Sequence, residues 1–215
     1  MARSWVEFLE GESLFSNSVR LKYLVWAIQR LADPGERLLE VGFGSGATSV
    51  LLADLGYQVT AVDIDPELVA TGRERYADWR RRGPLVIEQG DMFHLPWGTR
   101  SFSLVFHQGV LEHFADERIV EALKEQARIA TWIVFDVPNH RHRLKPFGDE
   151  RLLPPSHWRR LILEAGLILV EEGGRDFQRW LYLLPHAVFS RWGVERLGWL
   201  LRRLAINSVF VCRGR

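Results

Sequence analysis

Apolar residues along the chain follow two alternating spacings, one typical of helices and one typical of short buried strands. Helical spacing covers residues 17–32, 47–55, 116–129 and 156–165, and apolar runs that predict strands cover 38–41, 58–63, 85–87, 102–106, 131–137, 167–171 and 208–212. Because strands and helices alternate, we expect an α/β fold in which a mostly parallel sheet carries helices on both faces.

The residues between these segments agree with the predicted boundaries. Asp33-Pro34-Gly35 ends the first helix, Gly56 ends the second, and Asp65-Pro66 offers an N-cap and a first-turn proline for a helix after the second strand. Without repeats or low-complexity linkers, one domain is expected. Its parts are an N-terminal helical cap (1–36), a core (37–172), a helical insertion (173–206) and a last strand (207–215).

Composition narrows the class of protein. The 215 residues, 47% of them hydrophobic, suffice for one core, and the net charge of +1 gives no overall attraction to nucleic acid or to an anionic membrane. The single cysteine, Cys212, excludes an internal disulfide and argues against a cysteine-rich zinc site. The first residues lack a secretory apolar region and no apolar run reaches membrane-spanning length, so the expected location is the cytoplasm.

A glycine-rich loop follows the first predicted strand and precedes a helix, with the sequence Glu40-Val41-Gly42-Phe43-Gly44-Ser45-Gly46. Glycines there permit a tight turn and let a ligand lie against the backbone at the helix N-terminus. Asp63 ends the second strand, where a carboxylate can accept hydrogen bonds from both ribose hydroxyls. Together these features predict a cofactor that contains a nucleoside.

Two kinds of cofactor fit this pattern. Through Ala47 the loop also satisfies the dinucleotide pattern G-x-G-x-x-G/A, so an NAD(P)-dependent oxidoreductase is an alternative. Glu40 argues against it, because a carboxylate before the first glycine repels a pyrophosphate and attracts the ammonium of an amino-acid group. Asp91, after the third strand, is placed to meet an adenine amino group, and a Tyr-x-x-x-Lys catalytic pair is absent.

In these segments the chain resembles the class I S-adenosylmethionine-dependent methyltransferases, especially the small-molecule, methyltransferase type 11-like group. The resemblance covers residues 37 to about 172 and the final strand. It is carried by Leu39-Glu40-Val41-Gly42-Phe43-Gly44-Ser45-Gly46, Val62-Asp63-Ile64-Asp65, Gly90-Asp91-Met92, and Phe102-Ser103-Leu104-Val105 leading to Val110-Leu111-Glu112-His113. It implies a Rossmann-like, seven-stranded sheet whose last strand is antiparallel.

The resemblance also implies which residues would hold S-adenosylmethionine. The methionine and sulfonium would face Glu40, Gly42, Phe43, Gly44 and Gly46, the ribose Asp63 and Ile64, and the adenine Ile64, Asp91 and Met92. His107 and Gln108 would line the same site, and Arg20 or Tyr23 could reach the methionine carboxylate.

Methyl transfer from a sulfonium is an in-line displacement from an activated donor, so a base is needed only when the acceptor arrives protonated. His107, at the end of the fourth strand, is the first candidate for a base or acceptor-orienting group, with Gln108 beside it and His140 as a second candidate. The alternative is that His107 only bonds the backbone or lines the cofactor pocket. A metal is not expected, because Gly109 stands where metal-binding relatives carry an acid before Glu112-His113.

Two further segments are candidates for the acceptor side. The basic loop after the fifth strand includes Arg141 and Arg143, which suit a carboxylate or phosphate on the acceptor, or is simply solvated. The helical stretch 175–205, with Phe177 on one face, carries Trp180 and Tyr182. It is interpreted as a lid over an apolar or aromatic acceptor, a dimer surface, a peripheral membrane contact or additional core.

The sequence therefore predicts a methyltransferase, a monomer or homodimer, that uses S-adenosylmethionine and methylates an O, N or C atom of a small-molecule acceptor. The alternatives are an NAD(P)-dependent oxidoreductase and a non-catalytic cofactor-binding or scaffolding protein. Nucleic acid is not an expected partner, because the N-P-P-[YF] type of motif that holds a flipped base is absent after the fourth strand.

Overall fold

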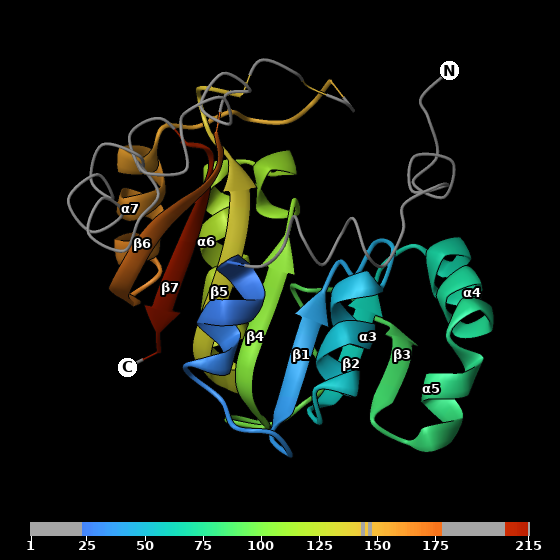
Figure 1. The fold of residues 1–215 in the computed structure, drawn as a ribbon. Helices are drawn as coiled ribbons and strands as arrows, with labels where there is room; N and C mark the ends of the chain where they lie inside the picture. Colours follow the sequence, from blue (N-terminus) through green and yellow to red (C-terminus); the bar gives the residue numbers. More distant parts are fainter. Residues whose placement is uncertain (1–22, 143–144, 146–147, 178–204, 215) are drawn as a thin grey trace, which may run out of the picture.

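The computed structural model describes residues 23–142, 145, 148–177 and 205–214. Its centre is a sheet of seven strands: β1 (Arg37–Val41), β2 (Gln58–Asp63), β3 (Leu85–Gln89), β4 (Phe102–Gln108), β5 (Ala130–Pro138), β6 (Ile168–Phe177) and β7 (Ala205–Arg213). Their order is β3-β2-β1-β4-β5-β7-β6, and β7 runs antiparallel to both of its neighbours while the first five strands pair in parallel (Figure 1). The predicted fold class is confirmed.

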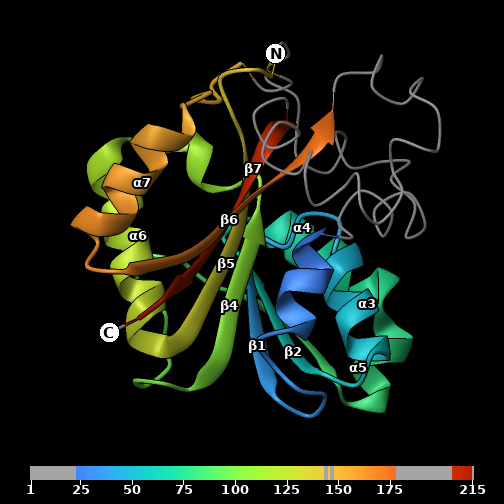
Figure 2. The same cartoon turned by 60° about the vertical axis from the view of Figure 1, so that its left-hand side comes forward.

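Helices cover both faces of the sheet (Figures 1 and 2). One face packs against the helical residues 23–29, α3 (Ala47–Asp54) and α4 (Pro66–Arg75), and the other against α6 (Asp116–Ile129) and α7 (Pro155–Glu164). A 3₁₀ turn, η1 (Leu111–His113), follows β4. The five strands inside the sheet are mostly apolar on both sides because both of their sides are buried, whereas the edge strands β3 and β6 expose several residues.

Local signals set several of these helix boundaries. The Asp65 side chain accepts hydrogen bonds from the backbone N–H groups of Glu67 and Leu68, at 2.8 and 3.4 Å, and Pro66 occupies the first turn of α4. This is the N-cap that the sequence predicts. By contrast, α5 (Ala77–Arg82) is not among the predicted helices. It buries none of its residues, so it has no apolar face that a pattern could reveal.

The predicted helical insertion is wrong at both of its ends. Residues 173–177 belong to β6 and residues 205–206 to β7, and the two strands pair as far as Phe177 opposite Ala205. The backbone groups of this segment are satisfied across the sheet by residues about 30 positions away, which a local helical pattern cannot show. The rest of the predicted insertion, with Trp180 and Tyr182, lies outside the described residues, as does Arg143.

Candidate active site

The glycine loop joins β1 to α3 in a conformation that only glycine adopts easily. Gly42, Gly44 and Gly46 have φ values of 65°, 53° and 73°. A Cβ on Gly42 would lie 2.7 Å from Cγ2 of Val110, and the Gly42 N–H donates to the carbonyl of Val62 at 2.8 Å. The loop therefore lies directly against the segment that follows β4, with no room for a larger residue at Gly42.

Tyr76 holds the far side of this loop. A Cβ on Gly46 would lie 2.7 Å from Cε2 of its ring, and its hydroxyl donates to the carbonyl of Ser45 at 2.7 Å. This residue is not among those predicted from the sequence, because the contact joins the C-cap of α4 to a loop 31 positions earlier and leaves no local signal. The loop is thus fixed from α4 as well as from the segment after β4.

Glu40 is a buried carboxyl group in β1, immediately before the loop. It is 4% exposed and accepts a hydrogen bond from the hydroxyl of Ser49 in α3. Burial raises its pKa to about 8, against an ordinary value of 4.5, and the nearby charge of Asp63 contributes in the same direction. The free protein therefore carries Glu40 mostly protonated at neutral pH, ready to ionise if a cation enters the site.

Asp63 and Asp91 stand at the carboxyl ends of the next two strands of the sheet. Asp63 is the last residue of β2, and burial raises its pKa although the backbone N–H of Asp65 donates to its Oδ1 at 3.1 Å. Asp91 follows β3 and accepts the N–H of Phe93 at 3.0 Å. Since β3, β2 and β1 are neighbours in the sheet, the structure brings the three predicted acids to one edge.

Apolar side chains accompany these acids. Ile64 is 66% exposed directly after Asp63, whereas Met92 is buried after Asp91. An exposed isoleucine at the end of a buried strand offers an apolar surface on which a flat ring can pack. This fits the position that the resemblance implies for Ile64.

His107 lies in an enclosed environment beside an aromatic ring. It is fully buried on the face of the sheet that packs against α6, where its ring stacks on Phe135 with centroids 5.3 Å apart and an angle of 13°. Burial lowers its pKa to about 3, which Gln126 of α6 only partly offsets. A buried imidazole with this pKa is neutral at pH 7 and poorly suited to take up a proton, so its predicted role as a base gains no support here. Gln108, the last residue of β4, is half-buried.

The segment after β4 and the loop after β5 border the same edge. Glu112 is buried, its carbonyl accepts the N–H of Arg151 at 2.8 Å, and Nδ1 of His113 lies 2.8 Å from Asp149. These contacts hold the two segments together. Among the described residues, no group of three or more His, Cys, Asp or Glu side chains is arranged to hold a metal ion.

The loop after β5 is held by a residue that sequence analysis misses, Asn139. Its buried amide donates to the carbonyl of Ala205 at 3.0 Å and to Oγ of Ser208 at 3.1 Å, and its oxygen accepts the N–H of Arg141 at 2.9 Å. His140 is exposed beside it, and partial burial and the charge of Arg141 lower its pKa. Arg141 is half-buried, and Tyr23, in the N-terminal helix, is 40% exposed.

The sheet order, the glycine loop after β1 and the carboxylates of three successive strands together define the class I methyltransferase architecture. A family model described as a methyltransferase domain matches residues 39–131. The chain is 49% identical over 186 residues to a ubiquinone biosynthesis O-methyltransferase of Xanthomonas axonopodis pv. citri, covering 76% of this chain and 74% of that one. The chain belongs to the class I S-adenosylmethionine-dependent methyltransferase family, so the predicted family is confirmed.

Other similarities agree at the level of fold or domain. An uncharacterized methyltransferase of Bacillus subtilis, YodH, is 33% identical over 127 residues, covering 57% of this chain, and the chain spans only about half (52%) of the YodH length. The structure of magnesium protoporphyrin IX methyltransferase from Synechocystis PCC 6803 with bound S-adenosylhomocysteine superimposes with a TM-score of 0.67 at 15% identity, covering 93% of this chain and 84% of that one. In the part of the chain that the structure describes, the helices are too short or too polar to cross a membrane.

Proposed function

We propose that this protein transfers a methyl group from S-adenosylmethionine to an oxygen atom of a small-molecule acceptor. The observation that carries the proposal is the edge formed by Glu40, Asp63 and Asp91 beside the left-handed glycine loop. The choice of oxygen is supported by the Xanthomonas O-methyltransferase, which aligns with about three quarters of this chain. Nitrogen and carbon acceptors are the alternatives.

Each end of the site suits one part of the cofactor. The buried Glu40 carboxyl can ionise beside an ammonium group, and the bare backbone of the loop allows the methionine portion to lie close to Gly42. Asp63 can accept both ribose hydroxyls, with the exposed Ile64 and with Asp91 available to the adenine. S-Adenosylmethionine, when bound, supplies a methyl group that is already activated for displacement.

The residues of the chain then have to align the acceptor and exclude water. Alignment alone can provide a large part of the rate enhancement when the donor is activated. Of the two histidines predicted as bases, His140 is the one that the structure exposes, whereas His107 is buried and neutral. We therefore assign His140 to the acceptor side, with Arg141 next to it to receive a carboxylate or phosphate.

Calorimetric titration with S-adenosylmethionine, S-adenosylhomocysteine and NAD tests the choice of cofactor. Binding of the first two compounds and not of NAD is expected. Binding of NAD alone would overturn the proposal in favour of an oxidoreductase. The same protein is then supplied with labelled S-adenosylmethionine and hydroxylated aromatic acceptors, and mass spectrometry locates the methyl group; methylation at nitrogen or carbon would contradict the choice of oxygen.

A cytoplasmic location also remains a proposal. It is supported by the lone cysteine, Cys212, which is buried, with its pKa raised to about 12 by burial. Whether the protein acts as a monomer or a homodimer is tested by analytical ultracentrifugation with and without cofactor.

A further inference from the structure

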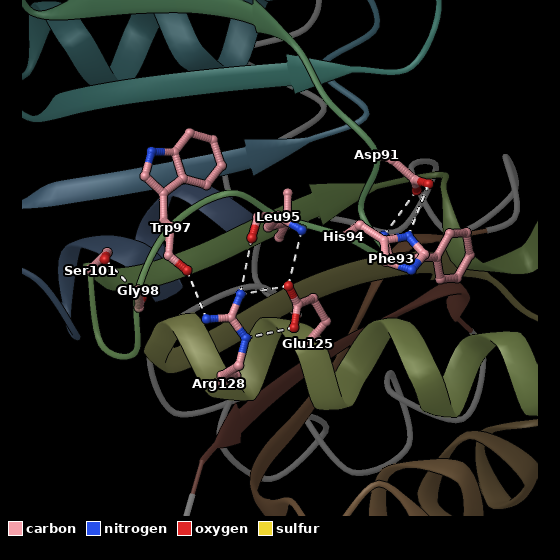
Figure 3. Close-up of polar contacts among 9 residues, drawn as sticks. All are labelled: Asp91, Phe93, His94, Leu95, Trp97, Gly98, Ser101, Glu125 and Arg128. Atoms are coloured by element: carbon pink, nitrogen blue, oxygen red, sulfur yellow. Dashed lines mark hydrogen bonds and ion pairs between the residues drawn. The ribbon is translucent and has the colours of Figure 1, made fainter.

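The loop between β3 and β4, residues 90–101, runs along α6 and is attached to it at several points (Figure 3). Leu95, near its middle, is 4% exposed, so both polar groups of its backbone need partners within the protein. Oε1 of Glu125 accepts the Leu95 N–H at 3.0 Å, and Nη2 of Arg128 donates to the Leu95 carbonyl at 3.0 Å. Two side chains of one helix thus supply the bonds that a neighbouring strand would otherwise give.

Glu125 and Arg128 are themselves joined by two hydrogen bonds. Arg128 donates through Nε and Nη2 to the two carboxylate oxygens, at 2.7 and 2.6 Å, and through Nη1 to the carbonyl of Trp97 at 2.7 Å. The hydrogen bonds from Arg128 lower the pKa of Glu125, and Glu125 raises that of Arg128. Both groups stay charged at neutral pH, and the planar guanidinium bonds the carboxylate and two carbonyls at once, which an ammonium group cannot do in the same geometry.

The position of Asp91 depends on how the four residues after it, 92–95, are held. Its Oδ1 accepts the N–H of Phe93 at 3.0 Å, and its carbonyl accepts the N–H of His94 at 3.0 Å. The ring of Phe93 meets that of Phe114 edge-on, with centroids 5.3 Å apart, and the guanidinium of Arg118 lies 3.4 Å from the Phe93 ring centroid. The segment is therefore anchored at Phe93 to Arg118 of α6 and to Phe114, two residues before that helix, and it is anchored to α6 again at Leu95.

We propose that Glu125 and Arg128 are positioning residues for the adenine end of the cofactor site. They hold residues 91–97 against α6, so that the Asp91 carboxylate stays oriented toward the adenine amino group. The inference rests on the proposed function, because it takes Asp91 to face adenine. Glu125 and Arg128 would then help to determine specificity, although they lie 30 or more positions away from Asp91 in the chain and act on it only through the loop.

The test compares the dissociation constants of S-adenosylhomocysteine and S-inosylhomocysteine, in which a carbonyl replaces the adenine amino group. If Asp91 is held in place, the protein should bind S-adenosylhomocysteine more tightly, because in S-inosylhomocysteine a carbonyl oxygen would face the Asp91 carboxylate. Arg128→Ala is expected to weaken binding of S-adenosylhomocysteine roughly tenfold and to bring the ratio of the two dissociation constants toward one. Asp91→Ala should change the ratio in the same way, because it removes the carboxylate itself. Arg128→Lys, which keeps the charge, should restore only part of the preference.

Arg81→Ala is the matched control, because Arg81 forms an exposed i,i+3 pair with Asp78 on α5, away from the loop. It should leave both dissociation constants unchanged. If thermal unfolding shows that Arg128→Ala does not fold, Glu125→Gln takes its place, because glutamine keeps an acceptor oxygen for the Leu95 N–H. Hydrogen exchange of the free protein should be faster at residues 93–97 in either variant than in the wild type.

The outcomes separate this inference from the proposed function. If the wild type prefers the adenine compound and the variants keep that preference, the inference is wrong and the proposed function stands. Equal weakening of both compounds also overturns the inference, because a purely structural role produces that result. If the wild type binds neither compound, the proposed function and the inference fall together.

Discussion

Replacing Glu40 by glutamine tests whether this buried carboxyl carries a proton in the free protein. Glutamine keeps the size and an acceptor oxygen for the hydroxyl of Ser49, but it cannot ionise. The pKa of Glu40 is raised from 4.5 to about 8 by burial. Between these two pH values the folded wild type holds a proton that the unfolded chain has released.

The difference between the two pKa values of Glu40 sets the size of the expected change in stability with pH. A pKa raised in the folded state means that stability is fully present below about pH 4.5 and is lost as the pH rises toward 8. At about 1.4 kcal/mol for each pH unit, the contribution of Glu40 to the free energy of unfolding should fall by about 5 kcal/mol over this range. The difference in stability between Glu40→Gln and the wild type should shift by that amount in favour of the variant.

Urea unfolding of both proteins at intervals from pH 4.5 to 8.5 measures this difference. Ser49→Ala serves as a second variant, because the Ser49 hydroxyl lowers the Glu40 pKa and its loss should move the transition to higher pH. If the free energy of unfolding changes with pH in the same way for the wild type and Glu40→Gln, the reasoning is refuted, because Glu40 would then be ionised in the folded protein as in the unfolded chain.

The same carboxyl predicts a proton release on cofactor binding. If the methionine ammonium enters beside Glu40, the carboxyl must ionise, so at pH 7 about 0.9 proton should leave for each cofactor bound. Calorimetry in phosphate and in Tris, which differ in ionisation enthalpy, measures this number. The Glu40→Gln variant should release close to none, and equal release from both proteins would place the ammonium elsewhere.

Three further changes probe the rest of the site. Asp63→Ala should weaken S-adenosylmethionine binding by about 1–3 kcal/mol in calorimetry, through lost hydrogen bonds to the ribose, and unchanged affinity would mean that the ribose lies elsewhere. Gly42→Ala should lower the free energy of unfolding by about 1–3 kcal/mol in urea, because its Cβ meets Val110 at 2.7 Å and its φ is 65°; a Val110→Ala background should recover only the steric part. His107→Gln should cost about 1–3 kcal/mol of stability through lost stacking and leave the acid limb of the pH–rate profile in place, because the pKa of His107 is about 3; a shifted limb would restore its role as a base.

The strands and the glycine loop could be predicted from the sequence because their causes are local. Strands buried on both faces are short apolar runs, and β2 has the predicted bounds, Gln58–Asp63. The N-cap at Asp65 depends on residues two and three positions away. The three acids at the ends of successive strands were also predictable, since parallel strands present their carboxyl ends at the same edge.

Tertiary structure decided what depends on burial and on partners distant in the chain. The long pairing of β6 with β7 replaced the predicted helix at residues 173–177. His107 lies near the end of β4 as predicted, but it is fully buried and stacks on Phe135. Glu125 and Arg128 are an ordinary i,i+3 pair in the sequence, yet their partners are backbone groups about 30 residues away. The chain by itself determined the order of the strands and the acids that follow the first three, because both depend on local pattern, and only packing decided how far β6 extends and which side chains are buried.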